Sequence, residues 1–160
     1  MELPTTNMLR QVPYRKRLKV GDVFRLAYPG NKFIFGQIIS LSASVGGFDN
    51  CIKIYVYDFI TSDAEYLVNL SSKKLMCEPL FVNLLGFSRG YMPIIANMHL
   101  PDSSCADEWC FHDVPFKKYL DENGIELTKP KQNIGTWGLS NYLVLDDLIS
   151  KKLDLPLVDD

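Results

Sequence analysis

The stretch from Lys19 to Leu41, KVGDVFRLAYPGNKFIFGQIISL, contains the pattern that decides the fold. Apolar side chains alternate with others at Phe24 and Leu26 and again over residues 33–41, as expected for strands that bury one face. Between the two runs, Pro29 and Gly30 suit the central positions of a type II turn, because proline fixes the first φ angle and glycine tolerates a positive second one. The stretch therefore predicts a β-hairpin.

Gly36 interrupts the apolar run of the second predicted strand. A glycine inside a strand usually marks a bulge or a close approach of another group to the backbone. The next segment, CIKIYVYDF (residues 51–59), places Ile52, Ile54 and Val56 on one face and its aromatic residues on the other. Three such strands in succession predict an antiparallel meander. A bend at Gly36 would let it form a curled sheet or a small, partly open barrel.

Weaker patterns extend this prediction towards the C-terminus. The spacing of Ser62 and Glu65 is that of a capping box, which predicts a short helix through Leu70. The segment PFKKYLDENG predicts a helical turn that ends at Gly124, and NIGTWG reads as a loop. Further strands are predicted in the segments PLFVNLLGF, GYMPIIANMHL and EWCFHDV.

From about residue 140 the apolar period changes from two to about 3.6 residues. Leu145, Leu148, Ile149 and Lys152 then share one face of a helix that Ser140 or Asn141 would cap. We expect one α+β domain over residues 1–160. Its parts are a loose N-terminal arm (residues 1–13), a β-rich body (residues 19–100) and a C-terminal helix (residues 140–153).

The composition is that of an ordinary globular protein, with 47% hydrophobic and 22% charged residues. A formal net charge of -2 excludes a generally basic nucleic-acid binder, although a local basic patch stays open. The first twenty residues lack the apolar core of a signal peptide, and no apolar run approaches the roughly 20 residues that span a bilayer. With four cysteines spread along the chain, we expect a cytoplasmic protein with reduced thiols and no membrane association.

Cys105, Cys110 and His112 form the compact metal-like group of the sequence, spaced C-x4-C-x-H. Zinc sites usually pair cysteines two to four residues apart and add a second pair, which does not follow here. The sequence has no G-x-G-x-x-G, Walker or H-E-x-x-H motif. We therefore expect no cofactor, no metal and no enzymatic activity, and keep a hydrolase or metal enzyme built on these three residues as a third hypothesis.

A basic segment, RQVPYRKRLK, precedes the first predicted strand. Basic residues interleaved with an aromatic side chain can follow a phosphate backbone, although a solvated arm has the same composition. The second hypothesis is therefore a small barrel that binds nucleic acid. It would use Tyr14, Arg15, Lys16 and Arg17, together with the tyrosines of IYVYDF.

An acidic segment surrounds Trp109, with Asp107, Glu108 and Asp113 close to it in the sequence. An acidic surface with an exposed aromatic residue suits a basic partner, such as the active cleft of a nuclease. The alternative is an ordinary solvated surface with Trp109 in the core.

The runs VGDVFRLAYPGNKFIFGQII, IYVYDF and GFSRGYMPI together resemble the immunity protein twenty-six family of bacterial polymorphic toxin systems. The resemblance covers about residues 19–95, and Met92 stands where that family has a tryptophan after the Gly-Tyr pair. The matching positions, which we interpret as mainly structural, are Gly21, Asp22, Phe24, Leu26, Gly36, Gln37, Tyr57, Asp58, Gly90 and Tyr91.

The resemblance implies a non-enzymatic inhibitor that neutralises a cognate toxin inside the cell. We therefore expect a toxin as the partner, rather than a membrane or a nucleic acid. Tight binding would come from a few buried anchors, with charge setting the approach rate and the choice of partner. The candidate toxin-binding residues are Trp109, Asp107, Glu108, Asp113, Tyr91 and Tyr66.

Overall fold

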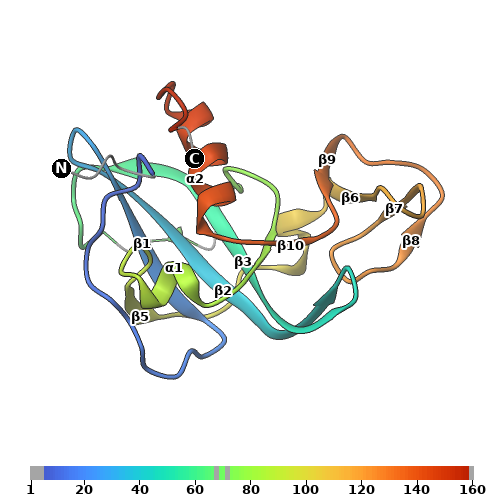
Figure 1. Cartoon of the computed structure of the whole chain (residues 1–160), viewed down its shortest axis with the longest axis horizontal. Helices are drawn as coiled ribbons and strands as arrows, with labels where there is room; N and C mark the ends of the chain where they lie inside the picture. The colour runs from blue at the N-terminus through green and yellow to red at the C-terminus, as the bar shows by residue number, and fades with distance from the viewer. Residues whose placement is uncertain (1–5, 67–68, 71–72, 159–160) are drawn as a thin grey trace.

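The computed structural model describes residues 6–66, 69–70 and 73–158, which form an α+β fold rich in strands (Figure 1). The first sheet has the strand order β10-β4-β3-β2-β1-β5, and the second has the order β8-β7-β6-β9. The strands of the first sheet are β1 (Asp22–Tyr28), β2 (Lys32–Val45), β3 (Phe48–Thr61), β4 (Leu80–Val82), β5 (Ile94–Asn97) and β10 (Leu139–Ser140). Those of the second are β6 (Trp109–Asp113), β7 (Lys118–Leu120), β8 (Glu126–Leu127) and β9 (Asn133–Thr136). The described helices are α1 (Leu85–Ser88), the 3-10 helix η2 (Ser103–Ala106) and α2 (Tyr142–Lys152).

The predicted hairpin and meander are confirmed, since β1, β2 and β3 pair antiparallel in succession. Tyr28 lies opposite Lys32, so the first hairpin has a three-residue loop. Gly30 has the positive φ that the type II pattern requires (86°), and Asn31 also takes a positive φ, of 59°. Asn31 is therefore the extra residue that makes this loop longer than a two-residue hairpin loop.

Gly36 combines both roles that a strand glycine suggests. It lies opposite Phe24 on β1, and a Cβ at this position would lie 2.2 Å from the Phe24 ring and 2.7 Å from the Tyr55 carbonyl oxygen. The register between β2 and β3 also shifts between Ile34 and Gly36. The sheet keeps two edge strands, β5 and β10, so it is a curled open sheet and does not close into a barrel.

The first sheet is covered on both faces. One face carries the larger core, where Phe24 and Ile54 pack with the helix residues Phe87 and Leu145. The other face carries a smaller core that includes Phe35, Tyr55 and Tyr57. The predicted alternation holds along β3. Along β2, however, Leu41 packs on the larger core and not on the face of Phe35 as predicted. The register between β2 and β3 shifts between Ile38 and Ser40, which places Leu41 on the opposite face.

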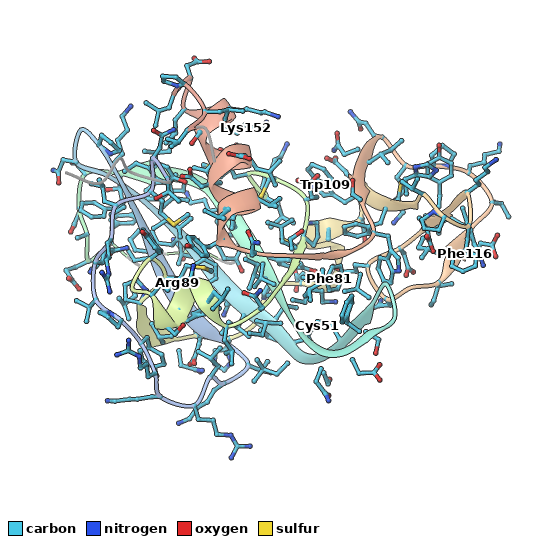
Figure 2. The ribbon with its side chains drawn as sticks, viewed as in Figure 1. Cys51, Phe81, Arg89, Trp109, Phe116 and Lys152 are labelled. Carbon is cyan, nitrogen blue, oxygen red and sulfur yellow. The ribbon has the colours of Figure 1, made fainter. Side chains whose placement is uncertain are left out.

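The second sheet packs against the first through an aromatic cluster around Phe81, which Figure 2 labels. Phe81 of β4 lies with its ring centroid 5.8 Å from that of Phe111 on β6. Trp137 contacts both rings, at 5.3 Å from Phe81 and 5.8 Å from Phe111. Three aromatic rings in edge-to-face contact therefore join the two sheets.

The predicted C-terminal helix is confirmed as α2, and Asn141 is its N-cap. The Asn141 side chain accepts hydrogen bonds from the backbone N–H groups of Leu143 and Val144. Leu145 and Ile149 are buried as predicted, whereas Lys152 is exposed. No helix among the described residues has the length and apolar character that crossing a membrane requires.

The prediction of a loose N-terminal arm is wrong for residues 6–13, while residues 1–5 lie outside the described part of the chain. Met8 is buried, and the backbone N–H groups of Asn7 and Met8 donate to the carboxylate of Asp146 at 3.0 and 2.8 Å. Leu9 adds a backbone hydrogen bond to Ala27. A buried carboxylate on α2 therefore holds a segment that shows no periodicity of its own.

Three shorter predictions also need correction. Residues 62–66 form turns and no helix, and the Asp63 side chain accepts a hydrogen bond from the Glu65 backbone N–H. Residues 67–68 of the predicted helix lie outside the described chain. The predicted helical turn before Gly124 is strand β7 and a turn, and NIGTWG contains strand β9. Tertiary pairing decides these segments: β9 pairs in parallel with β6, and β7 pairs antiparallel with it.

Candidate functional site

Trp109 lies between the second sheet and α2 (Figure 2) and lines an open groove. Two adjoining depressions, of about 570 and 360 Å³, share Met76, Trp109, Asn133 and Lys152. We call them together the Trp109 groove. Asp107 and Glu108, which precede Trp109 in the chain, also line the first depression.

Segments that are distant in the sequence build this groove. Trp109 begins β6 and lies opposite Asn133 at the start of the parallel strand β9. The Asn133 N–H donates to the Glu108 carbonyl at 3.0 Å, which fixes the backbone on both sides of the indole. The Met76 N–H donates to the Val56 carbonyl at 2.8 Å, so strand β3 holds the opposite wall.

The groove carries acidic side chains that have no partner in the described chain. The carboxylates of Asp102, Asp107 and Glu108 form no hydrogen bond or ion pair with the described residues. Lys74 and Lys152 line the same depression. Both signs of charge therefore lie within reach of a bound partner, and neither is neutralised by a direct contact.

Trp109 itself is partly exposed. Its indole N–H makes no hydrogen bond within the described residues, and none of their buried side-chain nitrogen or oxygen atoms lacks a partner, so this N–H is open to solvent. A partly exposed indole with a free N–H offers an apolar surface and one donor, the combination that anchors many protein interfaces.

The cysteine chemistry of the groove is that of neutral thiols. Burial raises the pKa of Cys105, and the nearby carboxylates Glu122 and Asp102 raise it further. A thiol with a raised pKa is a poor nucleophile near neutral pH, because the reactive form is the thiolate. The position of Cys105 in the groove therefore favours packing over covalent chemistry.

The structure does not bring Cys105, Cys110 and His112 together as a metal site. The Cys110 sulfur accepts from the Lys131 N–H at 3.2 Å, whereas Cys105 points to the Lys73 carbonyl at 3.9 Å. His112 packs on the Tyr119 ring, with centroids 5.0 Å apart. Within the described ranges, no three His, Cys, Asp or Glu side chains cluster as metal ligands would.

The other predicted binding residues lie away from the groove. Asp113 is at the far end of β6, four residues beyond Trp109. Tyr91 stacks on Tyr142 of α2, with centroids 4.9 Å apart, and Tyr66 stacks on Phe59 at 5.0 Å. Both tyrosines therefore have intramolecular partners for their rings.

Three of the residues that carry the family resemblance, Gly21, Gln37 and Tyr57, meet in one hydrogen-bond network. The Gln37 side-chain amide donates to the carbonyl oxygens of Gly21, Met98 and His99, at 3.0–3.1 Å. Its oxygen accepts from the Tyr57 hydroxyl at 2.6 Å. This network ties the start of β1 to the chain that follows β5.

Three further motif positions have other contacts: Asp22 lies at the same junction, Gly90 lies in a turn, and Asp58 lies at the end of β3 that faces Lys74. Asp22 accepts from the Lys19 N–H at 2.8 Å and from the Asn97 side chain at 3.0 Å. Gly90 has a φ of 96°, and a Cβ there would lie 3.1 Å from the Pro13 nitrogen. Asp58 is exposed, and its N–H donates to the Lys74 carbonyl at 2.7 Å.

The nucleic-acid hypothesis loses its predicted stacking surface. Tyr55 and Tyr57 are buried, with 3% and 0% of their surface exposed, so they are closed to bases. Their hydroxyls are committed to hydrogen bonds, to Glu122 for Tyr55 and to Gln37 for Tyr57. The basic residues 15–17 remain exposed.

Sequence reasoning missed the groove residues that come from outside the segment 107–113. Lys74, Met76, Asn133 and Lys152 carry no local signal. Asn133 lies beside Trp109 through the pairing of β6 with β9, Lys74 and Met76 through backbone hydrogen bonds to β3, and Lys152 through the position of α2. Sequence reasoning also missed a buried polar cluster at the junction of the sheets. There Glu122 accepts from the Tyr55 hydroxyl at 2.6 Å and lies 3.8 Å from the Lys53 ammonium.

Comparisons of the chain with protein-family models, with curated proteins and with solved structures find no match. The functional interpretation therefore rests on the residues and their geometry.

Proposed function

We propose that this chain is a cytoplasmic, non-enzymatic immunity protein that binds a bacterial toxin and covers its active surface. The observation that supports the proposal is the Trp109 groove, in which Trp109, Asp107 and Glu108 line one open depression of about 570 Å³. The resemblance to the immunity family comes from other residues, none of which lines the groove, and so supports the proposal separately.

The chemistry of the groove indicates how it would hold a protein. Trp109 offers an aromatic surface and a free N–H donor, as the central anchors of protein interfaces often do. Asp107 and Glu108 are exposed and unpaired, so they can attract a basic surface without first breaking an internal contact. Lys152, on the opposite wall of the groove, would favour a partner that places a carboxylate next to the Lys152 ammonium.

Retention of a protein from the source cell's lysate tests this proposal. The tagged chain is used as bait after nuclease treatment, so that nucleic acid cannot bridge it to other molecules. We expect a stoichiometric protein partner on the wild-type chain. The double variant Glu108→Lys, Trp109→Ala should lose it by at least about tenfold, because the anchor and its charge are removed together.

A matched control changes the same two kinds of side chain elsewhere. Phe116 is 71% exposed and Glu126 is also exposed, so Phe116→Ala, Glu126→Lys should retain the partner. A second groove variant, Asp107→Lys, Glu108→Lys, alters exposed charges alone and guards against misfolding at Trp109. Equal retention by the groove and control variants would contradict the proposal, and so would a partner that is recovered only when the nuclease treatment is omitted.

A further inference from the structure

A third depression, of about 510 Å³, is lined by residues of α1 and of the basic segment that precedes β1. Figure 1 shows the course of this segment past α1. The Tyr14 N–H donates to the Phe87 carbonyl at 2.9 Å, which fixes the basic segment beside the helix. Leu18, Ile52 and Phe87, all buried side chains of the larger core, line the depression. We call it the basic cleft, and none of its lining residues lines the Trp109 groove.

The charge of the basic cleft is of one sign. Arg15, Lys16 and Arg17 line it, and all three are exposed. They form no hydrogen bond or ion pair through their side chains with the described residues, and the lining contains no Asp or Glu. Three unopposed cations beside one depression favour an anionic occupant.

The opening of the cleft is apolar as well as basic. Leu84 lines it with 60% of its surface exposed, and the neighbouring Leu85 on α1 is 38% exposed. Exposed leucines above a floor of buried apolar side chains offer a place for an apolar side chain of the occupant.

We propose that the basic cleft binds an acidic peptide segment of a partner protein. A large apolar side chain of the segment occupies the space over Ile52 and Phe87, and its flanking carboxylates pair with Arg15, Lys16 and Arg17. The apolar surface that the cleft exposes most is that of Leu84, whereas of its aromatic lining residues Phe87 is buried and Tyr14 is partly buried. This favours a peptide over a nucleic acid, whose bases need exposed aromatic faces to stack on. The proposal does not depend on the toxin-binding function of the Trp109 groove.

A selection from a displayed library of random twelve-residue peptides tests the proposal on the full chain. We expect the bound peptides to share Asp or Glu residues within a few positions of Leu, Ile, Phe or Trp. Their affinity, measured by fluorescence anisotropy, should fall at least about tenfold on Arg15→Glu, Lys16→Glu, Arg17→Glu. It should fall several-fold on Leu84→Ser, and it should weaken as salt rises.

Matched variants separate the cleft from general charge and general hydrophobicity. Lys32→Glu, Lys117→Glu, Lys129→Glu changes the net charge by the same amount at exposed positions outside the cleft. Ile125→Ser removes an apolar side chain that is 62% exposed between β7 and β8. Both controls should bind the selected peptides as the wild type does.

Three results would overturn the proposal. In the first, the selection returns peptides without acidic residues. In the second, acidic peptides bind the cleft variants and the control variants with equal affinity. In the third, a single-stranded oligonucleotide or a vesicle of anionic phospholipid binds at Arg15–Arg17 and no selected peptide competes with it.

Discussion

Tyr28 donates a hydrogen bond of 3.0 Å to Asp146, although 118 positions separate the two residues. The same carboxylate accepts the backbone N–H groups of Asn7 and Met8. One buried side chain on α2 therefore joins the N-terminal segment, strand β1 and the C-terminal helix. Burial and the Asp146 charge both raise the pKa of Tyr28, so its hydroxyl remains a donor throughout the physiological range.

Replacing Asp146 should destabilise the fold strongly. Asp146→Ala leaves the Tyr28 hydroxyl and two backbone N–H groups without their acceptor in the core, at an expected cost of about 2–4 kcal/mol in the free energy of unfolding. Urea unfolding measures the loss, with Glu126→Ala as an exposed control that should change little. A loss below about 0.5 kcal/mol would show that the junction is not needed.

Gly36 should not tolerate even one methyl group. The Cβ of alanine would lie 2.2 Å from the Phe24 ring and 2.7 Å from the Tyr55 carbonyl, so Gly36→Ala should cost about 2–4 kcal/mol as both strands shift. A methyl group at Gly138 would meet no atom within 4 Å beyond its chain neighbours, so Gly138→Ala serves as the control. Thermal unfolding of both variants gives the comparison, and equal melting temperatures would contradict the close approach.

Loss of the Tyr57 hydroxyl should weaken the junction around Gln37. Tyr57→Phe leaves the buried Gln37 oxygen without its 2.6 Å donor, at an expected cost of about 1–2 kcal/mol. Tyr66→Phe removes a hydroxyl that makes no hydrogen bond to the described chain, and should be nearly neutral. If chemical denaturation gives the two variants the same stability, the Gln37 network contributes nothing.

The stability contribution of Glu78 should depend on pH in a defined direction. Burial raises the pKa of Glu78 above its usual 4.5, with Lys151 and Lys152 opposing the shift. The folded chain then binds the proton more tightly than the unfolded chain does, so ionisation costs stability as the pH rises from 4.5 through the raised pKa. Glu78→Gln should therefore match the wild type below pH 4.5 and become the more stable protein at neutral pH. Denaturation midpoints from about pH 4 to 8 measure this, and a difference that stays constant with pH would contradict it.

The meander around Gly36 could be predicted because its information is local. Alternation along β1, β2 and β3 and the Pro29-Gly30 turn each lie within one short segment. The second sheet could not be predicted in the same way, since β8 and β9 are two and four residues long and β9 owes its form to parallel pairing with β6. The order of residues 6–13 likewise depends on Asp146, which the sequence places at the opposite end of the chain.

The candidate site likewise contains residues that local sequence predicts and residues that only tertiary packing places. Trp109, Asp107 and Glu108 were predictable as a group because they are neighbours in the sequence. The sequence could not show that Tyr91 and Tyr66 lie outside the groove, since tertiary packing sets their stacking partners, Tyr142 and Phe59. Lys152 reaches the groove only through the position of α2.

Growth of bacteria that express the captured partner tests the central claim most directly, because inhibition requires more than binding. The partner alone should arrest growth, and co-expression of the wild-type chain should restore it. Phe116→Ala, Glu126→Lys should restore growth equally well, whereas Glu108→Lys, Trp109→Ala should fail while remaining folded and soluble. Restoration of growth by the groove variant at wild-type level would contradict inhibition through the Trp109 groove, and so would a partner that does not arrest growth.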